Sequence, residues 1–287
     1  MLFRSLVLIL LADIMQESVG TLFAAAVFPG LLVAGLFCLY ILLIGVFRPH
    51  MVPPVSLEER QAMGRAELWG KLFRVALPPF GLVLAVLGSI IAGIAAPTEA
   101  ASMGALGSIL VTLIGRRFSW ATLWATMTDT AKITGQMMFI LICAQVFAIA
   151  FRGLGGERLV QDAFALLPGG VAAEVWFMLG IVFLLGFFIE WIEICYIAVP
   201  LFLPIFQQQG VDLVWVGMLV CVMLQTSFLT PPFGWALFFL KGVAPPQVKT
   251  GDLYRGVIPF IGLQVGATVL VFFFPGLATW LPQAIGW

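Results

Sequence analysis

Long apolar runs separated by short polar segments dominate the chain. A membrane-spanning helix needs about 20 consecutive, mostly apolar residues. Six runs have about that length or more, over residues 21–47, 75–95, 133–151, 171–192, 211–229 and 256–276. Three other apolar segments are shorter or interrupted by proline or glycine, over residues 100–115, 194–206 and 233–243. The pattern predicts an all-α protein that crosses a membrane several times.

Two amphipathic segments lie between these runs. Residues 56–72 begin with Ser56 and carry Glu59 three positions later, which is the spacing of a helix capping box. We expect an interfacial helix here, although a solvated linker helix fits the same pattern. Residues 118–132, with Trp120 and Trp124 on one face, predict a second interfacial helix. The basic residues of 48–74 and the later pair Arg116–Arg117 place both of these loops in the cytoplasm.

Composition supports a membrane protein and excludes several other classes. The chain is 62% hydrophobic and 10% charged, whereas a soluble domain is about 25% charged. Fourteen basic and fourteen acidic residues balance, so no excess of charge points to nucleic acid. The single histidine, His50, cannot build a multi-histidine metal site. The four cysteines lie in apolar runs without CxxC spacing and are expected to be buried hydrophobic residues.

The segment GIAAPTEAASMGALGS, residues 93–108, combines a helix start with a run of small residues. Pro97 interrupts the apolar run, Thr98 is a candidate cap, and Glu99 lies in the first helical turn, where the helix dipole favours a carboxylate. The small residues that follow allow close helix packing. A capped turn between two spans and a close-packed functional corner both fit these residues.

The segment LGFFIEWIEICYIAVPLFLP, residues 185–204, carries two acidic residues at membrane depth. Glu190 and Glu193 are three apart and would share one face of a helix. A carboxylate in the bilayer costs about 3 kcal/mol or more, so a function is the default interpretation. Placement of both acids at the headgroup level is the alternative. Pro200 and Pro204 follow and predict that the helix unwinds or kinks there.

The segment QTSFLTPPFG, residues 225–234, breaks an apolar run with two prolines and a glycine. If the helix ends near Thr230, its free carbonyls and the Thr230 hydroxyl form an oxygen-rich site suited to Na⁺. Pro231 and Pro232 make the break, and Gly234 would let backbone approach closely. The preceding polar residues suggest a polar cavity: Gln225, Thr226 and Ser227. A plain proline kink is the weaker alternative.

These three segments together resemble the large membrane subunit of tripartite ATP-independent periplasmic (TRAP) transporters, the DctM family. The resemblance runs from about residue 5 to the C-terminus. It implies an elevator-type fold of two inverted repeats, each with a re-entrant hairpin and a broken helix. It also implies sodium-coupled import of an organic acid across the bacterial inner membrane, with Na⁺ as coupling ion and no other cofactor. The implied partners are a small membrane subunit, a periplasmic solute-binding protein, a carboxylate substrate and the lipid bilayer.

Carried over by position, the resemblance assigns sodium or substrate binding to the break at Thr230, Pro231, Pro232 and Gly234. It adds Gly186 and Glu190, the second of which stands where an acid is common in the family. The second hairpin would fall within about residues 137–168, with Ala144, Gln145 and Ala148 as weaker candidates at its tip or first arm. The broken helix would occupy about 211–243.

The resemblance also suggests an organisation in three parts. Residues 1–20 would be a remnant of the first repeat, 21–72 a scaffold helix with the interfacial helix, and 73–287 the second inverted repeat. The expectation is therefore a subunit that lacks most of the first repeat. A non-transporting fragment or a scaffold or assembly piece of such a permease is the alternative.

An intramembrane enzyme is disfavoured by the distribution of reactive side chains. A protease would need paired aspartates, or serine and histidine, in facing spans. The aspartates mostly lie at the edges of spans and His50 lies in a loop. We therefore expect no enzymatic activity, and a carboxylate is as far as the sequence defines the substrate.

Overall fold

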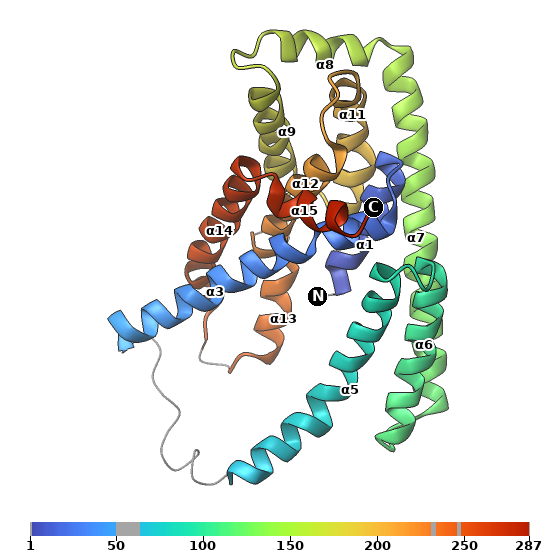
Figure 1. Cartoon of the computed structure of the whole chain (residues 1–287), viewed down its shortest axis with the longest axis vertical. Helices are drawn as coiled ribbons and strands as arrows, with labels where there is room; N and C mark the ends of the chain where they lie inside the picture. The colour runs from blue at the N-terminus through green and yellow to red at the C-terminus, as the bar shows by residue number, and fades with distance from the viewer. Residues whose placement is uncertain (1, 50–63, 231–233, 246–247, 287) are drawn as a thin grey trace. The chain divides into compact units, whose positions relative to one another are not determined.

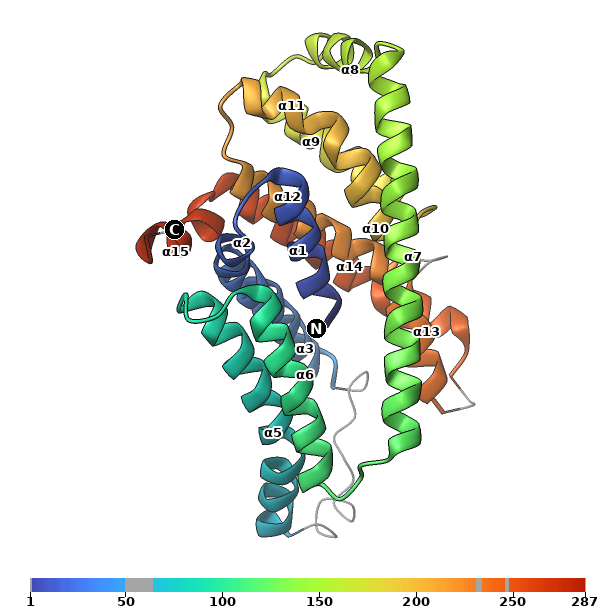
Figure 2. The same cartoon turned by 90° about the vertical axis from the view of Figure 1, so that its right-hand side faces the viewer.

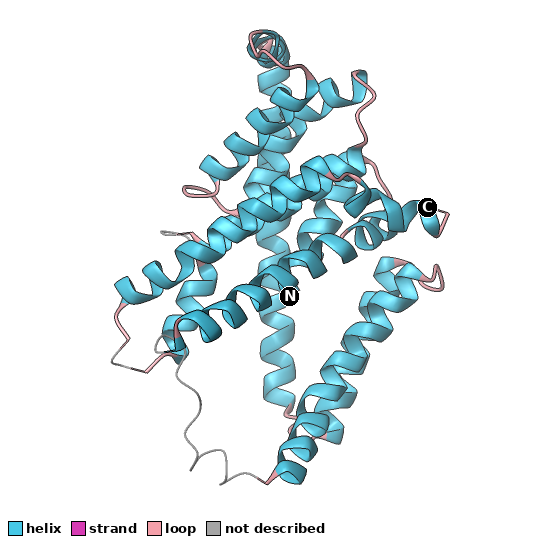
Figure 3. Ribbon diagram, turned by 60° about the vertical axis from the view of Figure 1, so that its left-hand side comes forward, coloured by secondary structure: helices cyan, strands magenta, loops and turns pink. Residues whose placement is uncertain are grey.

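The computed structural model describes residues 2–49, 64–230, 234–245 and 248–286 (Figure 1). Within these ranges the chain consists of helices joined by turns, and no strand occurs (Figure 3). It divides into two compact units, residues 1–37 with 135–287, and residues 38–134. The helices are α1 Leu2–Met15, α2 Val19–Ala25, α3 Val27–Phe47, α5 Arg65–Ile91, α6 Pro97–Ile114, α7 Trp120–Gly153, α8 Gly156–Ala165, α9 Val171–Leu185, α10 Trp191–Glu193, the π-helix η2 Ile194–Ala198, α11 Val199–Gln208, α12 Leu213–Leu229, α13 Trp235–Val243, α14 Thr250–Phe273 and α15 Gly276–Ala284.

Several helices are long and apolar enough to cross a bilayer. Among the described residues, five segments qualify: Val19–Phe47, Pro97–Ile114, Trp120–Gly153, Trp191–Gln208 and Thr250–Phe273. Many large apolar side chains are exposed along them, for example Leu42 and Phe139. Such surface is stable in lipid and costly in water. The prediction of an all-α, multi-pass membrane protein is confirmed.

Helix α12 forms the centre of the first unit. It packs against α14, α9, α1 and α2. Residues 216–224 of this helix are buried without interruption, which explains why this stretch is apolar on all faces. Asp212 caps the helix start, because its carboxylate accepts hydrogen bonds from the backbone amides of Val214 and Trp215. A buried helix with a capped start therefore supports the Thr230 break at its C-terminal end.

The second unit is built on the packing of α5 against α6. A Cβ at Gly104 would lie 3.2 Å from Val86 Cγ2, and one at Gly107 would overlap Leu82 Cδ1. The close packing expected from the small residues of α6 is confirmed. Glu99 closes the helix start by accepting a 3.0 Å hydrogen bond from the amide of Ala96. The N-cap is Ala96 with Pro97 following, so the expectation that Thr98 is the cap is wrong.

The boundaries of two long helices differ from those expected. Residues 120–132 do not form a separate interfacial helix, because α7 runs without interruption from Trp120 to Gly153 (Figure 2). Threonine hydroxyls along this stretch, such as those of Thr126 and Thr130, donate to carbonyls four residues earlier and need no outside partner. Residues 65–72 are likewise continuous with the following span in α5. The first part of the other expected interfacial helix, 56–63, lies outside the described residues.

Candidate functional site

The predicted helix break is present at the end of α12. The helix ends at Leu229, and Thr230 takes an extended conformation with φ −98° and ψ 126°. A second, short helix begins at Trp235 after Gly234. The expectation that the helix ends near Thr230 is confirmed, while Pro231 and Pro232 lie outside the described residues. The orientation of the hydroxyl groups around this break determines which ligands it suits.

Three hydroxyl groups in the last turns of α12 direct their protons into the helix. Thr230 Oγ1 donates to the carbonyl of Thr226 at 2.5 Å, and Thr226 Oγ1 donates to that of Met223 at 2.6 Å. Ser227 Oγ donates to the carbonyl of Leu224 at 2.5 Å. A hydroxyl has one proton, so each oxygen is left with lone pairs only. These oxygens can bind a cation but cannot donate to an anion.

The side chain of Gln225 is used for helix packing. Gln264 of α14 is 1% exposed. Its Nε2 atom donates to the carbonyl of Val222 and to Gln225 Oε1, each at 3.1 Å. The backbone carbonyl fixes which end of the Gln264 amide is the nitrogen, and this in turn fixes the Gln225 amide. Gln225 Oε1 therefore accepts one hydrogen bond from Gln264, and this side chain ties the last turn of α12 to α14.

Gly186 allows the end of α9 to approach the same turn of α12. A Cβ at this position would lie 2.8 Å from Ser227 Cβ, closer than such atoms approach in proteins. Trp191 packs on Phe228 with ring centroids 6.4 Å apart. The segment that contains Gly186 and Trp191 therefore packs against the last turn of α12, next to the break.

The two acidic residues of the second motif do not share a helix face. Glu190 precedes α10 as its N-cap, and Glu193 Oε2 accepts a 3.1 Å hydrogen bond from the Glu190 amide. The expectation of two adjacent carboxylates on one helix is wrong, because the chain is extended at Glu190. No group of three or more His, Cys, Asp or Glu residues suited to a metal occurs in the described part of the chain. Cation binding in this region therefore depends on hydroxyl and carbonyl oxygens.

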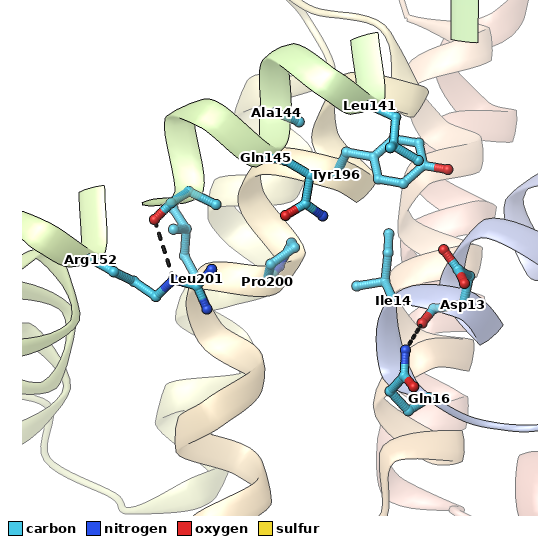
Figure 4. Close-up of a pocket in the computed structure, with 11 residues that line it drawn as sticks. Asp13, Ile14, Gln16, Leu141, Ala144, Gln145, Arg152, Tyr196, Pro200 and Leu201 are labelled. Carbon is cyan, nitrogen blue, oxygen red and sulfur yellow. Dashed lines mark hydrogen bonds between the residues drawn. The ribbon is translucent and has the colours of Figure 1, made fainter. Parts of the chain in front are cut away.

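A polar pocket of about 260 Å³ lies elsewhere in the first unit, between the end of α1, the second half of α7 and the π-helix with α11 (Figure 4). Its lining residues are Asp13, Ile14, Gln16, Leu141, Ala144, Gln145, Ala148, Arg152, Tyr196, Pro200 and Leu201. The π-helix has a local cause. Pro200 has no amide proton, so the carbonyl of Tyr196 cannot accept the usual α-helical hydrogen bond, and the wider π-turn accommodates this loss.

Charged groups stand on opposite sides of this pocket. Arg152 Nε donates to the carbonyl of Ala148 at 3.3 Å, which turns the guanidinium back along α7 and leaves its other N–H groups available. The Asp13 carboxylate lies on the far side, on the same side as the Tyr196 hydroxyl (Figure 4). Gln145 points into the space between them (Figure 4). The pocket can therefore bind a molecule that carries different groups at its two ends.

The structure brings some predicted site residues together and separates others. Ala144, Gln145 and Ala148 do line a pocket, but they lie inside the continuous helix α7 and not at a hairpin tip. The turn within 137–168 falls at Leu154–Gly155, before α8. Whether this segment is re-entrant stays a prediction. Sequence reasoning missed Asp13, Arg152 and Tyr196, although the Tyr196–Pro200 spacing is a signal of a disturbed helix turn.

A family model and individual relatives point to the same protein family. A family model described as "Tripartite ATP-independent periplasmic transporter, DctM component" matches residues 5–277. The chain is 30% identical, over 98% of its length, to the C4-dicarboxylate TRAP transporter large permease protein DctM of Pseudomonas aeruginosa. It is 31% identical, over 96% of its length, to the ectoine/5-hydroxyectoine TRAP transporter large permease protein UehC of Ruegeria pomeroyi.

Similarity extends to a relative named for a third type of substrate. The sialic acid TRAP transporter permease protein SiaT of Haemophilus influenzae is 25% identical over 98% of the chain. All three relatives are named as permeases, and none as an enzyme. The chain covers 64%, 63% and 44% of their respective lengths. The chain therefore spans less than two thirds of the relatives that it matches.

Proposed function

Because the chain belongs to the family of the DctM component of tripartite ATP-independent periplasmic transporters, we propose that it serves in the large membrane subunit of a sodium-coupled importer. The substrate is an organic acid that a periplasmic solute-binding protein delivers, and a small membrane subunit completes the permease. The chain is a multi-pass protein of the bacterial inner membrane. Transport itself is proposed for the whole subunit, of which this chain covers a part.

Sodium coupling is supported by a set of oxygens at the α12 break that can accept but cannot donate. Thr226 and Thr230 are 1% and 6% exposed, and their hydroxyl protons are donated to helix carbonyls. A hard cation without its water shell needs such oxygens, and broken helix ends supply them in ion-coupled transporters. Binding of Na⁺ here would hold the ends of α12 and α13 in one arrangement. The substrate would then meet a preformed site, and the loaded domain would move against the scaffold helix over residues 21–47.

The proposal is tested by the thermal unfolding of the purified chain in detergent, with Na⁺ or K⁺ at equal ionic strength. A ligand that binds only the folded state stabilises it by about 2.7 kcal/mol when its concentration is 100 times Kd. We expect Na⁺, and not K⁺, to raise Tm in a concentration-dependent way. Thr230→Val keeps the side-chain shape, removes the oxygen, and should abolish the difference between the two salts.

Thr279→Val is the matched control. The Thr279 hydroxyl donates to the carbonyl four residues earlier, at Pro275, as the Thr230 hydroxyl does to Thr226, but it belongs to α15. This variant should keep the full response to Na⁺. Equal responses of the wild-type chain to Na⁺ and K⁺, or an unchanged Na⁺ response in Thr230→Val, would contradict sodium binding at the break.

A further inference from the structure

The pocket between α1, α7 and the π-helix presents one charge of each sign. Asp13 comes from the end of α1 and Arg152 from the last turn of α7, and they stand on opposite sides of the pocket (Figure 4). Neither side chain takes part in an ion pair within the described part of the chain. Ionisable groups on membrane helices usually pair with each other or mark the path of a substrate. Two opposite charges that line one space without pairing therefore indicate a ligand that carries both complementary charges.

The Arg152 end can bind a carboxylate. The Nε atom of Arg152 donates to the carbonyl of Ala148 at 3.3 Å, which turns the guanidinium back along α7. Its terminal N–H groups can pair with both oxygens of a carboxylate, which is the geometry that a guanidinium group favours. This end of the pocket therefore suits the acid group of an organic acid.

The Asp13 end suits a cation. Gln16 donates to the backbone carbonyl of Asp13, while no described residue donates to the Asp13 carboxylate. The Tyr196 hydroxyl lies on the same side of the pocket and can accept a hydrogen bond (Figure 4). An ammonium group has three donors, no acceptor and a positive charge, so it complements these oxygens, whereas a second carboxylate would be repelled. The far end of the ligand is therefore cationic.

The length of the pocket allows only a short spacer between the two charges. From the level of Ala148 to that of Leu141, which lies on the Asp13 side, α7 rises by about 10 Å at about 1.5 Å per residue (Figure 4). A hydrogen bond of about 2.8 Å at each end leaves about 5 Å between the terminal atoms of the ligand. An extended chain advances by about 1.2 Å per bond, so about four bonds separate these atoms. A β-amino acid has this separation between its nitrogen and its carboxylate oxygen.

The remaining lining of the pocket suits methylene groups. Apart from Gln145, which points into the space between the two charges (Figure 4), most of it is apolar: Ile14, Leu141, Ala144, Ala148, Pro200 and Leu201. A ligand with a hydroxyl group on each carbon would leave several of these groups without a partner, which costs binding energy. The volume of about 260 Å³ is at the small end of ligand pockets and agrees with a short ligand.

We propose that this pocket binds the substrate and that the substrate is a short zwitterion of the β-amino-acid type. Its carboxylate pairs with Arg152, and its ammonium group pairs with Asp13 and donates to the Tyr196 hydroxyl. A dicarboxylate of the same length is rejected, because its second carboxylate faces Asp13. The assignment rests on the proposed function, from which it takes the carboxylate, and it adds the charge and the distance of the far end.

The test is a series of three-carbon acids, each titrated calorimetrically into the purified full chain at pH 7, in NaCl and a buffer that is not itself zwitterionic. β-Alanine carries an ammonium group, 3-hydroxypropanoate a hydroxyl group, malonate a second carboxylate, and propanoate none of these. We expect β-alanine to bind about fivefold or more tightly than propanoate and 3-hydroxypropanoate, because Asp13 is exposed and adds an ion pair that solvent weakens. Malonate should bind no better than propanoate, and 6-aminohexanoate, which is too long, should bind less tightly than β-alanine.

Substitutions at the two ends connect the preference to the residues. Asp13→Asn keeps the shape, removes the charge, and should bring β-alanine and propanoate within about twofold of each other. Asp13→Lys reverses the charge and should make malonate the tighter ligand. Arg152→Gln should weaken the binding of all the acids. Asp162→Asn and Arg158→Gln make matched changes at exposed positions of α8 outside the pocket, and they should leave the series unchanged.

The outcomes separate this inference from the proposed function. Sodium-dependent stabilisation together with equal binding of β-alanine, propanoate and malonate, or with no binding of β-alanine, would overturn the inference and leave the proposed function in place. A β-alanine preference that Asp13→Asn and Arg152→Gln abolish, without any response to Na⁺, would support the pocket assignment and overturn sodium coupling. Tightest binding of malonate or 3-hydroxypropanoate to the wild-type chain, or loss of the preference in the α8 controls, would also overturn the inference.

Discussion

The close approach of α9 to α12 makes Gly186→Ala a sensitive test of the geometry at the break. The backbone at Gly186 is helical, with φ −59°, so alanine is allowed there and only its Cβ matters. That atom would lie 2.8 Å from Ser227 Cβ, and 3.3 Å from the carbonyl oxygen of Phe183. Two carbon atoms at this distance must move apart by several tenths of an ångström, which separates α9 from the last turn of α12.

The expected magnitude follows from two opposing effects. Overpacking of a well-packed site costs about 1–3 kcal/mol. Replacing glycine by alanine where the conformation permits it stabilises the folded state by about 0.4–1 kcal/mol, because alanine lowers the conformational entropy of the unfolded chain. We therefore expect a net loss of about 1–2 kcal/mol, measured as a lower Tm of the purified chain. At about 2–4 °C for each kcal/mol, the shift is well within the precision of a thermal scan.

Gly180→Ala provides the matched control on the same helix. No atom lies within 4 Å of the position that its Cβ would occupy, so this variant should be neutral or slightly stabilising. Ser227→Gly removes the opposing Cβ and should partly rescue Gly186→Ala, whereas Ser227→Ala keeps that Cβ and should not. Equal Tm values for the two glycine variants, or equal rescue by both Ser227 variants, would refute the steric explanation.

Three other predictions use the same thermal assay. Gln264→Leu removes the donor to the Val222 carbonyl and to Gln225 Oε1 and should cost about 1–3 kcal/mol, because two hydrogen bonds of this buried contact are lost; a cost equal to that of the exposed Gln161→Leu would contradict the network. Asp212→Ala removes the cap of α12 and should cost about 0.5–2 kcal/mol, with Asp212→Asn close to wild type; equal losses in both variants would point to the charge instead. Gly107→Val should separate α5 from α6 and lower Tm, whereas Gly81→Val, with open space around it, should change Tm less; the reverse order would show that this packing is wrong.

The sequence predicted helix ends well where proline or glycine interrupts an apolar run. Leu229 and Gln208 end helices within two residues of the expected positions, whereas α9 ends at Leu185, seven residues before the end expected for 171–192. It failed where polar residues alone suggested a boundary, as before residue 133. There the chain has no proline, the threonine hydroxyls bond to their own helix, and Asp129 pairs with Lys132 at 3.6 Å. Polarity by itself does not end a helix when the side chains satisfy each other.

The pocket could not be predicted from the sequence, because it needs three segments that are far apart along the chain. Asp13 follows the first apolar run, Arg152 ends α7, and Tyr196 lies in the π-helix. Each has an ordinary explanation when considered alone, as an interfacial charge or a belt residue. Only the packing of the first unit places them around one space.

The chemistry of the break shows what a structure adds to a motif. The residue types at 226, 227 and 230 indicate hydroxyl groups near a broken helix, and a hydroxyl can serve a cation or an anion equally well. The hydrogen bonds to Met223, Leu224 and Thr226 use up every proton and leave acceptors. Gln225, which the sequence also nominated, accepts a hydrogen bond from Gln264 and links α12 to α14. The direction of these few hydrogen bonds therefore identifies three hydroxyl oxygens that can coordinate a cation and cannot donate to an anion.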